Sequence, residues 1–265
     1  MYKIILTIIL YSFQYCVGQN IVKKETTETY KGLNKFGKIE KGELTFKSTI
    51  YYDKKGNAIS YLSKSENPYD TYLNVKETTK FNIANHPVER NLYNLDGSLI
   101  EKTIFKYDKN GNEIEYILYK SDGSLNTKWT FIYNDKGQKT EHFRFDSDGI
   151  QKNVFYYDSK GNIELEKRYQ DEILFNYSKN SYDDKGYVIK IETYNVDDSL
   201  ISTESMKYDL NGNIIENITD SSINDKIFKY SYTYSQFNKF GKWTKKISYL
   251  NDEIDNIEIR KYEYF

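Results

Sequence analysis

The sequence predicts an all-β protein, an antiparallel meander of tandem β-hairpin repeats that curls into an open shell or an incomplete barrel. Three observations support this fold class. A turn motif recurs along the chain, the segments between turns alternate apolar and polar residues, and aromatic residues make up 17% of the 265 residues. Recurrence at a regular spacing is typical of a repeat array, and alternation with a period of two is typical of strands.

The recurring turn is Tyr-Asp-x-x-Gly, in most copies followed by Asn. Its five copies begin at Tyr52, Tyr107, Tyr157, Tyr182 and Tyr208. An Asp side chain at the start of a type I turn accepts backbone hydrogen bonds, and Gly readily adopts the positive φ at which the next strand begins. Each copy therefore predicts a β-hairpin with a type I turn and a G1 bulge.

A second turn, Tyr/Phe-x-x-Asp-Gly, alternates with the first and occurs at Gly123 and Gly149. Together the two turn types assign a structural role to nine glycines: Gly56, Gly97, Gly111, Gly123, Gly137, Gly149, Gly161, Gly186 and Gly212. Between residues 97 and 161 these glycines lie 12 or 14 residues apart. That spacing leaves strands of roughly 8 to 10 residues, and about a dozen strands in all.

The strands themselves have one aromatic and one polar face. In the segment 228–234, for example, every second residue is Phe or Tyr and the residues between them are polar. Open sheets seldom exceed ~10 strands without curling, so we expect the sheet to roll up with its aromatic face inward. Pro68 and Pro87 bracket the one stretch in which the turn spacing fails. We expect an irregular insertion there, or a repeat with longer loops.

The chain divides into three segments. Residues 1–18 are interpreted as a signal peptide, with Lys3, an apolar run over 4–13 and small residues before a cut at Gln19. The apolar run is too short to span a bilayer, so we expect no integral membrane span. Lipidation of Cys16 is the alternative, although Tyr15 is bulky for such a site. Residues 19–49 should supply the leading strands and 50–265 the repeat domain of a periplasmic, surface or extracellular protein.

The composition gives no sign of catalytic or metal chemistry. The formal net charge is −1, which offers no basic footprint for nucleic acid. The carboxylates of Asp108 and Asp158 have a turn-forming role. The segment 146–149 lacks the spaced ligands of a calcium loop, and His86 and His142 lie far apart without a Cys partner for zinc. We therefore expect no cofactor, no metal and no catalytic residue.

The segments 105–112 and 156–162 carry the pattern Tyr-Asp-x-x-Gly-Asn after an aromatic residue. This pattern resembles the YD repeat of the RHS (rearrangement hot spot) superfamily and covers roughly residue 51 to the C-terminus. The resemblance implies a long antiparallel sheet that spirals into a shell, as in secreted toxins and surface proteins. Asn or Gln stands where that repeat has Arg after the turn glycine, and no autocleavage segment or toxin domain is recognised. The shell is expected to carry over, and toxin encapsulation is not.

The aromatic residues of the strands have two interpretations. Tyr230, Tyr232 and Tyr234 form a ladder on one face, and Trp129 and Trp243 lie on strands that should also present aromatic stripes. In the first interpretation they pack as the core of a single curved sheet. In the second they form a stacking platform for a glycan or an extended peptide, and they are then the candidate ligand-binding residues.

These features favour an exported, non-enzymatic structural or binding protein of the bacterial cell envelope, with an envelope protein or a glycan as its partner. The first alternative is a secreted polysaccharide hydrolase or lyase, in which two carboxylates would converge within an aromatic groove of the curved sheet. The second alternative is an accessory or immunity partner of a toxin.

Overall fold

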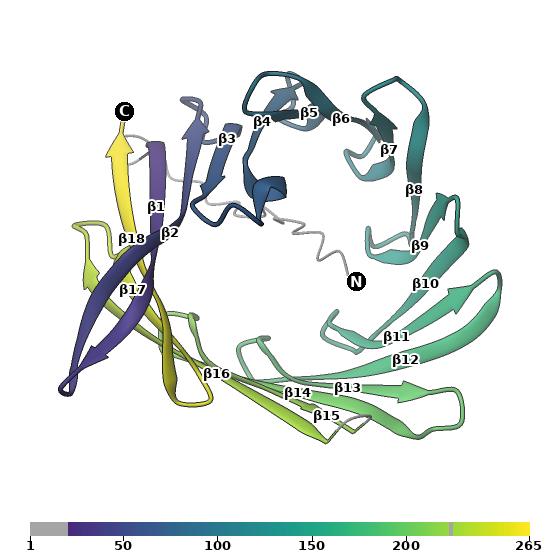
Figure 1. The fold of residues 1–265 in the computed structure, drawn as a ribbon. Helices are drawn as coiled ribbons and strands as arrows, with labels where there is room; N and C mark the ends of the chain where they lie inside the picture. Colours follow the sequence, from purple (N-terminus) through teal and green to yellow (C-terminus); the bar gives the residue numbers. More distant parts are fainter. Residues whose placement is uncertain (1–20, 223–224) are drawn as a thin grey trace.

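The computed structural model describes residues 21–222 and 225–265. In this part of the chain eighteen strands form one antiparallel sheet, connected as a meander from β1 to β18. The last strand also pairs with the first, so the sheet closes on itself as a barrel, and Figure 1 shows its strands arranged in a ring. One short 3-10 helix, η1 (Thr71–Leu73), lies between β3 and β4.

The strands are β1 (Val22–Lys35), β2 (Lys38–Tyr52), β3 (Ala58–Ser65), β4 (Val75–Phe81), β5 (Pro87–Asn94), β6 (Leu99–Tyr107), β7 (Glu113–Lys120), β8 (Leu125–Tyr133), β9 (Lys139–Asp146), β10 (Gly149–Tyr157), β11 (Ile163–Gln170), β12 (Ile173–Tyr182), β13 (Val188–Asn195), β14 (Leu200–Tyr208), β15 (Ile214–Ser221), β16 (Lys226–Phe237), β17 (Trp243–Leu250) and β18 (Glu253–Tyr264).

The Asp-x-x-Gly-Asn turns all lie at one end of the barrel, here called the YD rim. In the turn at 108–112, Asp108 Oδ1 accepts the backbone N–H groups of Asn110 and Asn112, each at 2.8 Å. Asp108 Oδ2 accepts the Asn112 side-chain amide at 2.9 Å, which explains why Asn follows the glycine. Gly111 has a φ of 85° and donates its N–H to the Asp108 carbonyl. All nine glycines assigned to turns have positive φ.

The stretch between the two prolines contains one regular turn and one longer loop. In the turn at 82–86, Asn82 Oδ1 accepts the backbone N–H of His86 at 2.9 Å, as the Asp does elsewhere. Asn85 occupies the glycine position with a φ of 62°, because Asn tolerates the left-handed region better than other non-glycine residues. The segment 66–74, which includes η1, is the longer loop.

Tyrosine hydroxyls connect successive hairpins at the YD rim. Each of these tyrosines lies near the end of a strand that runs toward that rim. Its hydroxyl donates a hydrogen bond to a backbone carbonyl at the start of the preceding strand. The donors and acceptors are Tyr107 and Pro87, Tyr133 and Glu113, Tyr157 and Lys139, Tyr182 and Ile163, Tyr208 and Val188, and Tyr234 and Ile214. The tyrosine of the motif therefore fixes each repeat to the one before it.

Closure corrects the predicted fold class. The expectation of an open shell or incomplete barrel of about a dozen strands is wrong, because β1 and β18 pair from Val22 opposite Tyr264 to Lys31 opposite Asn256, with one bulge between Val22 and Lys24. The backbone N–H of Phe265 also donates to the carbonyl of Ile21 at 3.1 Å. Pairing these two strands provides hydrogen-bond partners for the backbone N–H and C=O groups that an open sheet would leave exposed at its two edges. The irregular stretch and residues 22–52 supply strands that the glycine spacing did not count.

The barrel wall is a single layer. Among the described residues, the buried hydrophobic side chains are only Val22 and Ile257. Barrels of 16 to 18 strands are too wide for side chains to fill. Most wall residues are accordingly half-buried, and the alternation along each strand separates an inner wall from an outer wall.

The turn geometry predicts unequal costs for glycine substitutions. Gly111→Val should destabilise the barrel by about 1 to 3 kcal/mol, because valine is strained at positive φ and its Cβ would lie 2.9 Å from His86 Cε1. Gly137→Val should cost less, since its Cβ meets nothing within 4 Å. Urea unfolding measures both, with Lys109→Val as the control that should cost little. An equal loss in all three variants would contradict the turn assignment.

Candidate ligand site on the inner wall

The inner wall is identified by the desolvation of its ionisable groups. Burial raises the pKa values of Glu77, Glu101 and Glu113 above the usual range. Burial, aided by the positive charge of Lys139, lowers the pKa of His142 to about 4. In a single curved layer only the concave face brings side chains close enough together to remove their water. The cross-strand register places these groups on one face, which is therefore the inner wall.

The outer wall carries rows of ion pairs between adjacent strands. Hydrogen bonds from lysine ammonium groups lower the pKa values of Glu28 and Glu89 to about 2. The pairs are Lys80 and Lys102 with Glu89, Lys106 and Lys128 with Glu115, and Lys47 and Lys261 with Glu28, at 2.5 to 3.1 Å. Between them lie exposed apolar residues such as Ile132 and Tyr156. Lysine and glutamate thus occur repeatedly around the outside of the barrel.

The inner wall carries a continuous row of rings across five strands, here called the aromatic belt. Its members are Phe105 on β6, Tyr116 on β7, Trp129 and Phe131 on β8, His142 on β9 and Phe155 on β10. Tyr116 stacks on Trp129 with centroids 5.6 Å apart, and His142 lies edge-on to Trp129 at 5.3 Å and to Phe155 at 5.4 Å. Phe105 contacts Tyr116 at 6.0 Å. Each ring is only half-buried.

Charged groups border the belt. Arg90 lies over Phe105 at 5.3 Å, Lys139 over Phe131 at 3.9 Å and Arg144 over Trp129 at 5.8 Å. Such cations are attracted by the negative ring face. Beyond Phe155 the inner wall carries a cluster of polar side chains on β11 and β12. In this cluster Arg168 donates hydrogen bonds to Glu166 at 2.9 Å and to Ser178 at 3.0 Å.

A second aromatic cluster lies on β16 to β18. Trp243 contacts Tyr234 with centroids 5.4 Å apart, and the Arg260 guanidinium covers the Trp243 ring at 3.8 Å. Lys246 approaches both Trp243 and Tyr232, at 5.8 and 5.5 Å. One face of Trp243 is therefore occupied by the protein itself.

The five predicted ligand-binding residues thus divide between two places. Trp129 belongs to the aromatic belt, whereas Tyr230, Tyr232, Tyr234 and Trp243 lie on β16 and β17, which are not neighbours of β8 in the sheet. Tyr116, His142 and Phe155 join Trp129 in the aromatic belt but were not among the predicted ligand-binding residues. Alternation within a strand shows which of its residues share a face, but the register between strands, with its bulges, decides which rings meet.

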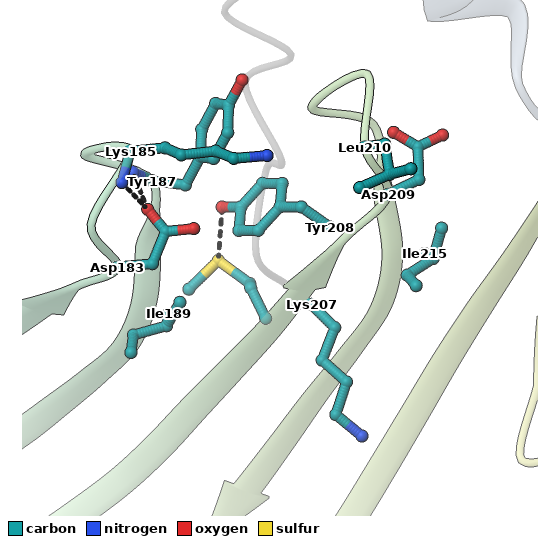
Figure 2. Close-up of a pocket in the computed structure, with 10 residues that line it drawn as sticks. Asp183, Lys185, Tyr187, Ile189, Lys207, Tyr208, Asp209, Leu210 and Ile215 are labelled. Atoms are coloured by element: carbon teal, nitrogen blue, oxygen red, sulfur yellow. Dashed lines mark hydrogen bonds between the residues drawn. The ribbon is translucent and has the colours of Figure 1, made fainter.

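The hollows at the YD rim belong to the turns. Figure 2 shows one of them, between the turn at 183–187 and β14, where Tyr208 lies beside Tyr187. Its volume is 370 Å³, and the Tyr208 hydroxyl lies 3.8 Å from the Met206 sulfur. The two tyrosine rings stack at 4.8 Å. Tyr187 follows the turn glycine, where the other Tyr-Asp-x-x-Gly turns have Asn, so an aromatic ring lies beside this hollow in place of an amide. A second hollow of 520 Å³ lies between the turns at 108–112 and 134–138. Both therefore follow from the repeated turn.

Residues 21–222 and 225–265 hold no group of three or more His, Cys, Asp or Glu side chains that could bind a metal ion. Within the same ranges, no helix is long and apolar enough to cross a membrane. The predicted signal peptide and Cys16 lie outside the described residues.

No protein-family model and no curated protein matches this chain. Among solved structures, a porin-like protein from Bacteroides uniformis aligns over 94% of this chain and 99% of its own, with 12% identity and a TM-score of 0.47. Structures described as TcdB2-TccC3-TEV and TcdB2-TccC3-Cdc42 align over 89% and 90% of this chain, with 10% and 8% identity and TM-scores of 0.28 and 0.25. This chain spans 17% of each of those two.

Closure of the sheet corrects the family prediction. The expected relation to the YD repeat of the RHS superfamily is wrong, because the sheet closes into one barrel of eighteen strands and does not spiral into a shell. The porin-like description belongs to the Bacteroides protein, and the envelope location of this chain stays a prediction.

The environment of His142 predicts a pH dependence of stability. Its folded pKa of about 4 lies below the ordinary value of 6.5, so the unfolded chain binds more protons between these values. Stability from the neutral imidazole is present above pH 6.5 and is lost as the pH falls toward 4. Between pH 7 and pH 4.5, His142→Phe should therefore lose roughly 2 kcal/mol less unfolding free energy than the parent, since one pKa unit corresponds to about 1.4 kcal/mol. Denaturant unfolding at pH 7 and pH 4.5 measures the difference, and parallel losses in both proteins would contradict it.

Proposed function

We propose that the protein is an exported, non-enzymatic binding protein of the bacterial envelope, with its ligand site on the inner wall of the barrel. The aromatic belt is the observation that carries this proposal. Large aromatic side chains are normally buried in a core, yet these rings remain half-buried on a concave wall. A row of partly open rings bordered by charged groups is typical of a ligand site.

The outer wall supports a location in water. Barrels that span membranes present an apolar band to lipid, and a Lys or Arg at its middle costs about 2 to 4 kcal/mol. Here Lys102 and Lys106 on β6 and Lys128 on β8 are paired with glutamates on the outer wall. We propose that the barrel stands in an aqueous compartment of the envelope and does not contact lipid with its wall.

Purification and a ligand screen test both parts. The chain from Gln19 should be recovered from the envelope fraction without detergent, as a folded protein in aqueous buffer. Intrinsic tryptophan fluorescence should then respond saturably to at least one of three pools: neutral oligosaccharides, peptides or fatty acids. A strict requirement for detergent would contradict the location. No response to any pool would contradict the binding function.

A polysaccharide hydrolase or lyase is the second candidate. Glu77 on β4 and Glu101 on β6 both pair with Leu92 on β5, so their Cα atoms lie two strand spacings apart, about 10 Å. Burial raises both pKa values, as a general acid requires. Product release from polysaccharides, abolished in Glu101→Gln, would favour this candidate. Binding without turnover would favour the first.

A further inference from the structure

We infer that the aromatic belt binds a neutral, linear oligosaccharide, an assignment that rests on the proposed binding function. The belt runs across the strands, so a ligand lying along it follows the circumference of the inner wall. Its first three rings, Phe105, Tyr116 and Trp129, come from three adjacent strands and pair directly opposite one another.

The spacing of the rings suits a chain of sugar rings. Neighbouring belt centroids lie 5.3 to 6.0 Å apart, close to the strand spacing of ~4.8 Å. Successive pyranose units of an extended glycan repeat at a similar distance. Each unit has an apolar C–H face that packs on an aromatic ring and a rim of hydroxyls that needs polar partners. A linear oligosaccharide therefore matches a wall on which aromatic rings and polar side chains lie side by side.

The polar groups beside the belt are of both signs. Arg90, Lys139 and Arg144 supply donors, and Glu101, Glu113 and Glu166 supply acceptors on the same wall. Mixed charge favours a neutral polyol over a polyanion or polycation.

Closure of the sheet argues against an extended peptide on this wall. Peptides commonly bind to sheets by adding a strand to a free edge. The described sheet pairs every strand on both sides, including β1 with β18, so no edge is open. A peptide on the inner wall would find only side chains for its backbone groups, whereas a glycan has no backbone amides to satisfy.

The two tryptophans allow a site-resolved test. In a Trp243→Phe background, Trp129 is the sole tryptophan, and its fluorescence should change saturably with neutral oligosaccharides of two to six units. Affinity should increase with length. Tyr116→Leu in this background should weaken binding at least about tenfold, or about 1.4 kcal/mol. Phe143→Leu is the matched control, since Phe143 lies on the outer wall of β9. Thermal melts establish that each variant is folded.

The outcomes separate the inference from the function on which it rests. Saturable oligosaccharide binding that Tyr116→Leu weakens and Phe143→Leu leaves unchanged supports the assignment. Binding of peptides or fatty acids at Trp129, without oligosaccharide binding, overturns the ligand class and keeps the binding function. Equal weakening by both variants overturns the assignment to the belt. No response of Trp129 to any pool overturns both.

Discussion

A chain that ends at Asp252, and so lacks β18, should fail to give a soluble monomer. The truncation removes the pairing of β18 with both β17 and β1 and leaves two strands with open edges. It also removes Ile257, whose side chain is fully buried. Unpaired edges of this length promote aggregation. Size-exclusion chromatography and circular dichroism should therefore show aggregated or unfolded protein, where the full chain gives a folded monomer.

A circular permutant is the matched control for this truncation. The Phe265 N–H lies 3.1 Å from the Ile21 carbonyl oxygen, so a short linker can join the two ends. New termini placed between Leu210 and Asn211, in the turn between β14 and β15, keep all strand pairs. This permutant should fold as a monomer with a melting temperature near that of the parent. A stable truncated chain together with an unfolded permutant would indicate an open sheet instead.

The local part of this fold is predictable because it depends on a few adjacent residues. The dihedral preference of Gly111 and the hydrogen bonds of Asp108 act within five residues, so the hairpin turns follow directly from the sequence. The turn at 82–86 obeys the same physics, but Asn85 adopts the positive φ there. A turn pattern that requires glycine therefore does not identify the turn at 82–86. The family resemblance failed for a related reason: a turn motif specifies hairpins and leaves the closure of the sheet undetermined.

Closure and the belt depend on contacts between distant residues. Tyr30 pairs with Ile257 across the seam, and nothing near either residue in sequence marks the other as its partner. The belt depends on register, which shifts at a bulge beside almost every turn, for example between Leu118 and Tyr119. A one-residue slip would move an entire set of side chains to the other wall. Alternation within one strand thus predicts a face, and only the paired strands determine which rings meet.

The cluster around Trp243 should contribute mainly to stability. Trp243→Ala should lower the free energy of unfolding by roughly 2 to 4 kcal/mol, since large-to-small changes lose both transfer energy and packing. The substitution also leaves the Arg260 guanidinium, now 3.8 Å above the ring, without its cation–π partner. Urea unfolding at neutral pH measures the loss.

The comparison with Tyr232→Ala tests why Trp243 matters. Trp243 contacts Tyr234, Arg260 and Lys246, whereas Lys246 lies 5.5 Å from the Tyr232 ring, so the loss of Tyr232 should cost less than that of Trp243. Neither change should alter oligosaccharide affinity at Trp129, because both residues lie outside the aromatic belt. If Trp243→Ala instead unfolds like the parent and loses ligand retention, the rings of β16 and β17 are a binding surface, and the ligand would have to reach beyond the belt to a second part of the inner wall.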